Sequence, residues 1–316
     1  MTSKQRLLSA LKGEKVDYIP FSPNLAYYFD FLPEETRNKG IFDYIVNMGA
    51  DPLMRGDVQA FEIKQNKCST KVMQNGNKIY TTITTPKGNL NLEQTCVELT
   101  KTCFISKHPV STIEGIELLK LYFEDLDVLP QIVSANEKIK DLGEKGLQLA
   151  ILGIGLKSAF QSLLEHWIGI ENLVYLCMDY PDEIDELLKI MQAKNLKTVE
   201  YTANSNISAC ISWEDSSTTN LSPAMYEKYI APEISNWCKI LKQVDKFYVQ
   251  HACGHIKDLL VPMAKQGISG IESICPPPTG NITIKQAVQD LPKNISIIGG
   301  IEPTHFLNDP INIILE

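Results

Sequence analysis

Short apolar runs alternate with longer amphipathic segments along most of the chain. The runs GLQLAILG, NISACISW, KFYVQH, ISGIESI and ISIIGG are typical of parallel strands that are buried on both faces. The alternation of such strands with helices favours a (β/α)8 TIM barrel over a doubly wound sheet. We expect parallel strands at residues 18–21, 51–55, 147–152, 207–213, 246–251, 269–273 and 295–299.

Helical periodicity fills most of the intervening sequence. The spacing of Leu7, Leu8 and Leu11 after Ser3, a candidate N-cap, predicts a first helix near the N-terminus. Further helices are expected at residues 36–48, 111–123, 127–142, 156–166, 171–179, 182–200, 223–242, 255–266, 283–290 and 303–316.

Residues near 60–100 have a different texture. Two alternating runs flank Asn75-Gly76, which predicts a hairpin, and a second turn follows at Pro86–Gly88. We expect an antiparallel β insertion within a single barrel domain spanning residues 1–316. Since Glu316 falls in the helix after the seventh expected strand, the last strand and helix of the barrel are expected to be missing.

Composition limits the partners and the compartment. The chain has 316 residues, a formal net charge of -8 and no basic run, which argues against a nucleic-acid partner. No apolar stretch is long enough for a membrane span, and the N-terminus lacks a signal-peptide pattern, so we expect a cytoplasmic protein. A disulfide framework is not expected among the eight cysteines, and Cys177, Cys210 and Cys238 are expected to be buried apolar side chains.

Candidate metal chemistry lies at the end of the expected strand KFYVQH. His251 and Cys253 are two positions apart, so both side chains should point to one face at the barrel mouth. An imidazole and a thiolate so placed can bind one zinc ion. On the next strand, Glu272 is an acidic residue in an apolar run and is the expected third ligand. The alternatives are an ion pair of Glu272 with a lysine, or an outward-facing position, and Cys275 is a second candidate for the third ligand.

Two further segments should reach the barrel mouth. Tyr27 and Tyr28 follow the expected first strand and are candidates to bind a small methylated substrate, or else they pack as ordinary loop aromatics. Trp213 at the end of its strand is a third candidate substrate-binding residue. Glu214 and Asp215 are candidate catalytic residues that orient the substrate or act as an acid, the alternative being an N-cap or a loop charge.

The sequence resembles the uroporphyrinogen decarboxylase superfamily, in particular its corrinoid-linked methyltransferase branch. The resemblance lies in MTSKQRLLSALKGEKVDYIPFSP, in LSPAMYEKYIAPEISNW, and in HACGHIKDLLVPMAKQGISGIESICPPPTGNITIKQAV followed by ISIIGGIEP. It implies a (β/α)8 barrel in which His251, Cys253 and a later residue bind zinc. Glu272 is placed like a glutamate ligand of the more distant cobalamin-independent methionine synthases.

The resemblance implies a zinc-dependent methyltransferase that moves a methyl group between a small methylated substrate, such as a methoxylated compound or methylamine, and a corrinoid carried by a partner protein. The alternatives are a methylcorrinoid:thiol methyltransferase, a lyase similar to uroporphyrinogen decarboxylase, and a non-catalytic family member. The three arginines of the chain are few for a substrate with many carboxylates, which argues against porphyrinogen decarboxylation.

Overall fold

The computed structural model describes residues 1–308, and for Ala26, Tyr27, Leu307 and Asn308 it describes the backbone alone. The chain forms two compact units. The first contains Met1–Ala60, Gln131–Leu152 and the chain from Glu200 onward, and the second contains Phe61–Pro130 and Gly153–Val199. Each unit is therefore built from segments that are far apart in the sequence.

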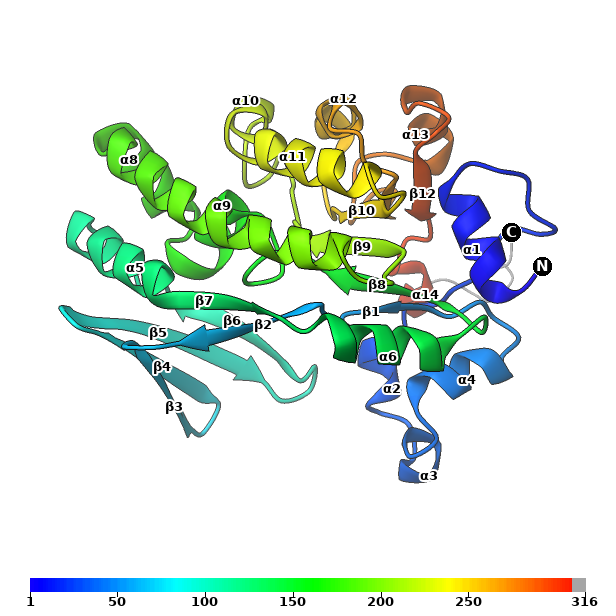
Figure 1. Cartoon of the computed structure of the whole chain (residues 1–316), viewed down its shortest axis with the longest axis horizontal. Helices are drawn as coiled ribbons and strands as arrows, with labels where there is room; N and C mark the ends of the chain where they lie inside the picture. Colours follow the sequence, from blue (N-terminus) through cyan, green and yellow to red (C-terminus); the bar gives the residue numbers. More distant parts are fainter. Residues whose placement is uncertain (309–316) are drawn as a thin grey trace. The chain divides into compact units, whose positions relative to one another are not determined.

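The first unit contains a six-stranded parallel sheet with the order β1-β8-β9-β10-β11-β12 (Figure 1). Its strands are β1 (Leu53–Arg55), β8 (Leu147–Ile151), β9 (Ala209–Trp213), β10 (Phe247–His251), β11 (Gly270–Ile274) and β12 (Ser296–Gly299). Strands that follow one another in this sheet pair in parallel, as consecutive strands of a TIM barrel do. The structure thus confirms the predicted α/β, TIM-barrel-like fold class, with six parallel strands among the described residues.

The helices α11 (Ala231–Lys242), α12 (Leu260–Lys265) and α13 (Ile284–Asp290) lie along one side of this sheet (Figure 1). Trp237 on α11 packs edge-on against Tyr248 on β10, with ring centroids 6.1 Å apart, and both side chains are buried. On this side, α11 packs against β10 and α13 packs against β12. The helices of this unit are α1 (Ser3–Leu11), α2 (Ala26–Phe29), α3 (Glu34–Arg37), α4 (Ile41–Asn47), α6 (Ile132–Leu142), α10 (Pro223–Met225), α11 (Ala231–Lys242), α12 (Leu260–Lys265), α13 (Ile284–Asp290) and α14 (His305–Asn308). No described helix is both long and apolar enough to cross a membrane.

The expected helix at residues 223–242 contains a π-helical turn at Tyr226–Ile230, between α10 and α11. Pro232 in the first turn of α11 has no amide hydrogen to donate to the carbonyl group of Lys228, so the regular pattern of hydrogen bonds is interrupted there. At the first helix, the N-cap is Thr2 rather than the predicted Ser3, since the Thr2 hydroxyl accepts from the Gln5 amide in a capping box.

The first expected strand, residues 18–21, is wrong. This segment forms no strand, and Tyr18, Ile19 and Phe21 are exposed. Pro20 lacks the amide hydrogen that a central strand needs, and the ring of Tyr18 instead stacks under the guanidinium of Arg6. An apolar tetrapeptide with a proline therefore indicated a strand where the chain makes none.

Two helix predictions also need correction. The segment 127–142 begins as strand β7 (Leu126–Pro130) and becomes helix α6 only after Gln131, because Leu126 and Val128 are buried in alternation and pair with β2 (Phe61–Gln65). The segment 36–48 is divided between α3 and α4, since Gly40 adopts a positive φ of 85° that ends the helical path. The predicted helix at 303–316 is described only as α14, and residues 309–316 lie outside the described part.

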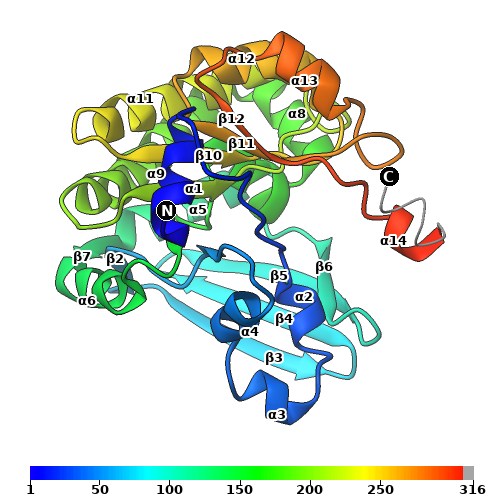
Figure 2. The same ribbon diagram turned by 90° about the vertical axis from the view of Figure 1, so that its right-hand side faces the viewer.

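The second unit contains a four-stranded antiparallel sheet, as the strand alternation predicted (Figure 2). The predicted hairpin joins the first two of its strands, but its turn residues are Gly76 and Asn77, since Asn75 still pairs with Lys78. Its strands are β3 (Ser69–Asn75), β4 (Lys78–Thr85), β5 (Gly88–Val97) and β6 (Thr102–Lys107), and the helical segments of the unit are α5 (Ile113–Asp125), α7 (Ala159–Ser162), a π turn at Leu163–Trp167, α8 (Ile170–Asp179) and most of α9 (Pro181–Ala203).

A disulfide joins Cys96 on β5 to Cys103 on β6, which the sequence did not lead us to expect. The two residues are direct partners in the antiparallel register, so their side chains point to the same face of the sheet. Cys210 and Cys238 are free and buried as predicted, whereas Cys177 is partly exposed.

Candidate metal centre

Three adjacent strands, β9, β10 and β11, end beside one another at the candidate site. Trp213 pairs in register with His251, and His251 pairs with Glu272. Since residues in register on parallel neighbours point to the same face of a sheet, these three side chains share one face, opposite the one that carries Tyr248. They lie at the carboxyl ends of the strands, where barrel enzymes carry their active sites.

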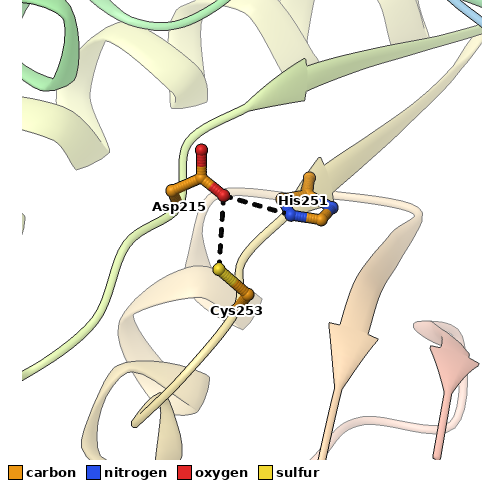
Figure 3. A group of neighbouring side chains, drawn as sticks. All are labelled: Asp215, His251 and Cys253. Carbon is orange, nitrogen blue, oxygen red and sulfur yellow. Dashed lines mark hydrogen bonds and ion pairs between the residues drawn. The ribbon is translucent and has the colours of Figure 1, made fainter. Parts of the chain in front are cut away.

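His251, Cys253 and Asp215 come together just beyond these strand ends (Figure 3). One donor atom from each lies within 4.8 Å of the other two. The Oδ1 atom of Asp215 lies 3.1 Å from Nε2 of His251 and 3.3 Å from Sγ of Cys253. The structure therefore brings His251 and Cys253 together as their spacing predicted, and it adds Asp215 as a third donor.

In the turn after β9, the side chains of Glu214 and Asp215 have different surroundings. Asp215 has a positive φ of 45°, a conformation that aspartate tolerates better than most residues. Glu214 is completely buried and accepts a hydrogen bond from the Ser212 hydroxyl at 2.6 Å. Of the two candidate catalytic carboxylates, only Asp215 reaches His251 and Cys253, and Glu214 belongs to the packed interior.

Glu272 approaches His251 from the other side of the imidazole ring. Its Oε2 atom lies 2.9 Å from Nδ1 of His251, while Oε1 accepts from both Nε and Nη2 of Arg55. The sequence offered an ion pair as the alternative to metal binding, but with a lysine as the partner. The cation is an arginine, and Glu272 does not join the group of three donors.

The electrostatics of the group favour a cation at Nε2 of His251. Burial acts to lower the pKa of His251, but its hydrogen bonds to Asp215, Cys253 and Glu272 outweigh burial and raise this pKa to about 11. Burial acts to raise the pKa of Glu272, but His251 and Arg55 hold it below its ordinary value. Two carboxylates beside one imidazole thus create a site that attracts positive charge.

The donor set fits zinc. Zinc binds thiolate sulfur, imidazole nitrogen and carboxylate oxygen in tetrahedral sites, and catalytic sites keep one position for water or substrate. Cys253, His251 and Asp215 supply one donor of each kind, and all three are only partly buried. The three donors are therefore partly accessible to solvent.

The remaining predicted residues have different surroundings. Tyr28 on α2 is 55% exposed, and the side chain of Tyr27 lies outside the described part of the structure. Trp213 is 36% exposed and lies on the same sheet face as His251. Cys275, directly after β11, is buried and outside the group of three donors, and burial raises the pKa of its thiol.

Sequence reasoning missed two features of this site. Asp215 was assigned to acid chemistry rather than to metal binding, although it follows its strand end as Cys253 follows the neighbouring one. The pairing of Arg55 with Glu272 joins residues 217 positions apart and has no local signature. The isolated charge within the apolar run of β11 was the available signal that Glu272 has a buried partner.

Comparison with known proteins finds a matching sequence family and similar solved structures. The sequence model of uroporphyrinogen decarboxylase (URO-D) matches residues 74–316. No curated protein matches the chain. Among solved structures, a methyltransferase from Methanosarcina mazei is similar, with a TM-score of 0.56 and 14% sequence identity over 95% of this chain and 83% of that chain. At this identity the likeness establishes the fold alone.

Proposed function

Because the chain belongs to the uroporphyrinogen decarboxylase family, we propose that it is a zinc-dependent methyltransferase built on the barrel of that family. In this proposal it moves a methyl group between a small methylated substrate and a corrinoid carried by a partner protein. A methoxylated compound and methylamine are the first substrates to test. The proposal includes the cytoplasmic location expected from the sequence.

The observation that carries the proposal is the convergence of Asp215, His251 and Cys253. One carboxylate, one imidazole and one thiol meet at the ends of neighbouring parallel strands, and each is accessible to solvent. When bound, zinc would act as a Lewis acid on the heteroatom that carries or receives the methyl group. The methyltransferase from Methanosarcina mazei, which shares the fold, makes methyl transfer the first chemistry to test.

The residues around the donors have separate roles in this proposal. Asp215, His251 and Cys253 would bind the ion once the Cys253 thiol, which donates a hydrogen bond to Asp215, has lost its proton. Glu272 accepts a hydrogen bond from Nδ1 of His251, so Nε2 is the nitrogen that faces Asp215 and would bind the ion. The partly exposed indole of Trp213 offers a flat surface next to His251 on which a methylated or cationic group can rest.

The arginines argue against a decarboxylase acting on a polycarboxylated substrate. Each nitrogen of the Arg55 guanidinium has a partner in the protein, since Arg55 donates to Glu272 and to the carbonyl group of Leu53. Arg6 is buried against Asp17 and Asp51. A guanidinium that binds a substrate carboxylate must face that carboxylate, and both of these arginines face carboxylates of the protein instead.

Zinc analysis and methyl transfer test the proposal together. The purified chain should bind about one zinc ion, and the His251→Ala and Cys253→Ala variants should lose it. The His305→Ala variant, which removes an exposed histidine of α14, should keep it. With zinc bound, the protein should transfer a methyl group from methylamine or a methoxylated aromatic compound to Co(I) cobalamin.

The reverse reaction distinguishes the main alternative. A methylcorrinoid:thiol methyltransferase would demethylate methylcobalamin in the presence of a small thiol and would leave methylamine untouched. Absence of zinc binding by the wild-type protein, together with no methyl transfer in either direction, would contradict the proposal.

A further inference from the structure

We infer that Glu272 is a positioning residue of the metal centre, which orients His251 and is itself held by Arg55, and that it does not bind the metal. This inference rests on the proposed function, because it assumes that His251 is a zinc ligand. It assigns the charged residue of β11 a role different from the ligand role that its sequence position suggests.

The geometry at His251 places Glu272 on the wrong side of the ring for metal binding. The carboxylate of Glu272 lies 2.9 Å from Nδ1, whereas Asp215 lies 3.1 Å from Nε2. The lone pairs of the two ring nitrogens point in divergent directions. An ion that Nε2 shares with Asp215 and Cys253 therefore lies across the imidazole from Glu272.

Both oxygens of Glu272 already have partners. Oε2 faces Nδ1 of His251, and Oε1 accepts two donors from Arg55. The side chains of Glu272 and Arg55 are 7% and 13% exposed, so water does not readily replace either partner. Arg55 is fixed in turn by its hydrogen bond to the Leu53 carbonyl group, 3.1 Å away on its own strand.

This chain of contacts determines which nitrogen of His251 is free to bind. When Nδ1 donates its hydrogen to Glu272, the lone pair of a neutral imidazole lies on Nε2, toward Asp215. The positive charge of Arg55 balances the negative charge of Glu272, which lowers the cost of burying the carboxylate. Arg55 on β1 and Glu272 on β11 thus orient a ligand that belongs to β10.

The first experiment compares Glu272→Gln with a matched control. Glu302→Gln changes another buried glutamate of the same unit, one that binds Thr279 and Thr304. Competition with a chromophoric chelator should show zinc affinity reduced about 10–100-fold in Glu272→Gln, the loss typical of a residue that orients a metal ligand. The affinity of Glu302→Gln should stay within about twofold of wild type.

Cobalt substitution separates orientation from ligation. In Glu272→Gln the Co²⁺ spectrum should keep its thiolate-to-cobalt absorption and the shape of its d–d bands, because the same three side chains bind the ion. In Asp215→Asn the d–d bands should change, since a ligand is altered. If Glu272→Gln changes these bands as Asp215→Asn does, Glu272 is a ligand and the inference is wrong.

A double variant separates orientation from general stability. Arg55→Met combined with Glu272→Gln removes both charges and leaves no uncompensated buried ion. Its urea midpoint should lie closer to that of the wild type than the midpoint of Glu272→Gln does. Its zinc affinity should stay as low as that of Glu272→Gln. Recovery of zinc affinity along with stability would show a merely structural role and would overturn the inference.

The wild-type protein decides which idea has failed. If it binds neither zinc nor cobalt, the proposed function fails and the inference fails with it. If it binds both metals and Glu272→Gln binds zinc with unchanged affinity, the inference alone is wrong.

Discussion

Two arginines of the first unit form ion pairs with carboxylates, and the comparison shows how one type of ion pair can serve two purposes. Arg6 on α1 donates to Asp17 at 2.6 Å and to Asp51 at 2.5 Å, and neither partner contacts the metal donors. Arg55 on β1 pairs with Glu272, which contacts His251. The first arrangement joins parts of the backbone, whereas the second continues into the candidate site.

The partners of Arg6 explain its structural role. Asp51 is 1% exposed, and its amide donates to the carbonyl group of Phe21 at 2.7 Å. The guanidinium of Arg6 also lies 3.7 Å from the centre of the Tyr18 ring. Arg6 therefore fixes α1, the segment at Tyr18 and the start of β1 against one another.

Replacing Arg6 should produce the largest loss of stability among the three arginines. Arg6→Met leaves the buried carboxylate of Asp51 without its cation, which should cost about 3–5 kcal/mol of unfolding free energy. Urea denaturation followed by circular dichroism measures this loss. The folded fraction should bind zinc with wild-type affinity, and a parallel loss of affinity would show that the two arginines do not differ as proposed.

Replacing Arg55 should mainly affect metal binding. Arg55→Met should weaken zinc binding by about 10–100-fold, because Glu272 loses the partner that holds it in position beside His251. Its loss of stability should be smaller than that of Arg6→Met, since Glu272 keeps His251 as a neighbour. Chelator competition and urea denaturation on the same preparation check both parts, and a stability loss with unchanged zinc affinity would contradict the comparison.

Acid should affect the Arg6 cluster in a defined direction. Hydrogen bonding to Arg6 is the main cause that lowers the pKa of Asp17 in the folded protein. The Asp17 carboxylate therefore stabilises the fold fully at pH values above its unfolded pKa of about 3.9. This stabilisation is lost as the pH falls below that value. Between pH 7 and pH 3 the urea midpoint of wild type should therefore drop more than that of Arg6→Met. Equal drops would remove the role assigned to Asp17.

Replacing Arg37 should have the smallest effect on stability and zinc affinity, and it serves as the control for the Arg6 and Arg55 variants. It is exposed on α3 and donates only to the Leu32 carbonyl group, at 3.0 Å, among the hydrogen bonds of the described residues. Arg37→Met should change stability by no more than about 0.5 kcal/mol and leave zinc affinity unaltered. A larger change in either measurement would show that loss of an arginine charge acts through net charge rather than through specific partners.

The strands of the parallel sheet were predictable because burial on both faces leaves nearly continuous apolar sequence, as in Leu147–Ile151. Residues 18–21 showed the same apolar character, but Pro20 and the stacking of Tyr18 on Arg6 prevent a strand there. Residues 127–130 were assigned to a helix because the strand Leu126–Pro130 depends on pairing with Phe61–Gln65, which is distant in sequence.

The candidate site was predictable only where its geometry is local. His251 is the last residue of β10 and Cys253 follows it by two positions, so this local spacing was enough to bring their side chains together. The role of Glu272 depends on Arg55, whose proximity comes from the folded sheet and not from any local pattern. The disulfide between Cys96 and Cys103 was not predicted, because it depends on the register of β5 and β6 in the folded sheet.

X-ray absorption at the zinc edge of the metal-loaded protein tests the central claim most directly. With Asp215, His251 and Cys253 as ligands, the first shell should contain one sulfur at about 2.3 Å and nitrogen or oxygen donors at about 2.0–2.2 Å, with the scattering pattern of one imidazole. Two sulfur atoms per zinc would bring Cys275 or another thiol into the site, and a shell without sulfur would exclude Cys253. Either result would contradict the metal centre proposed for this chain.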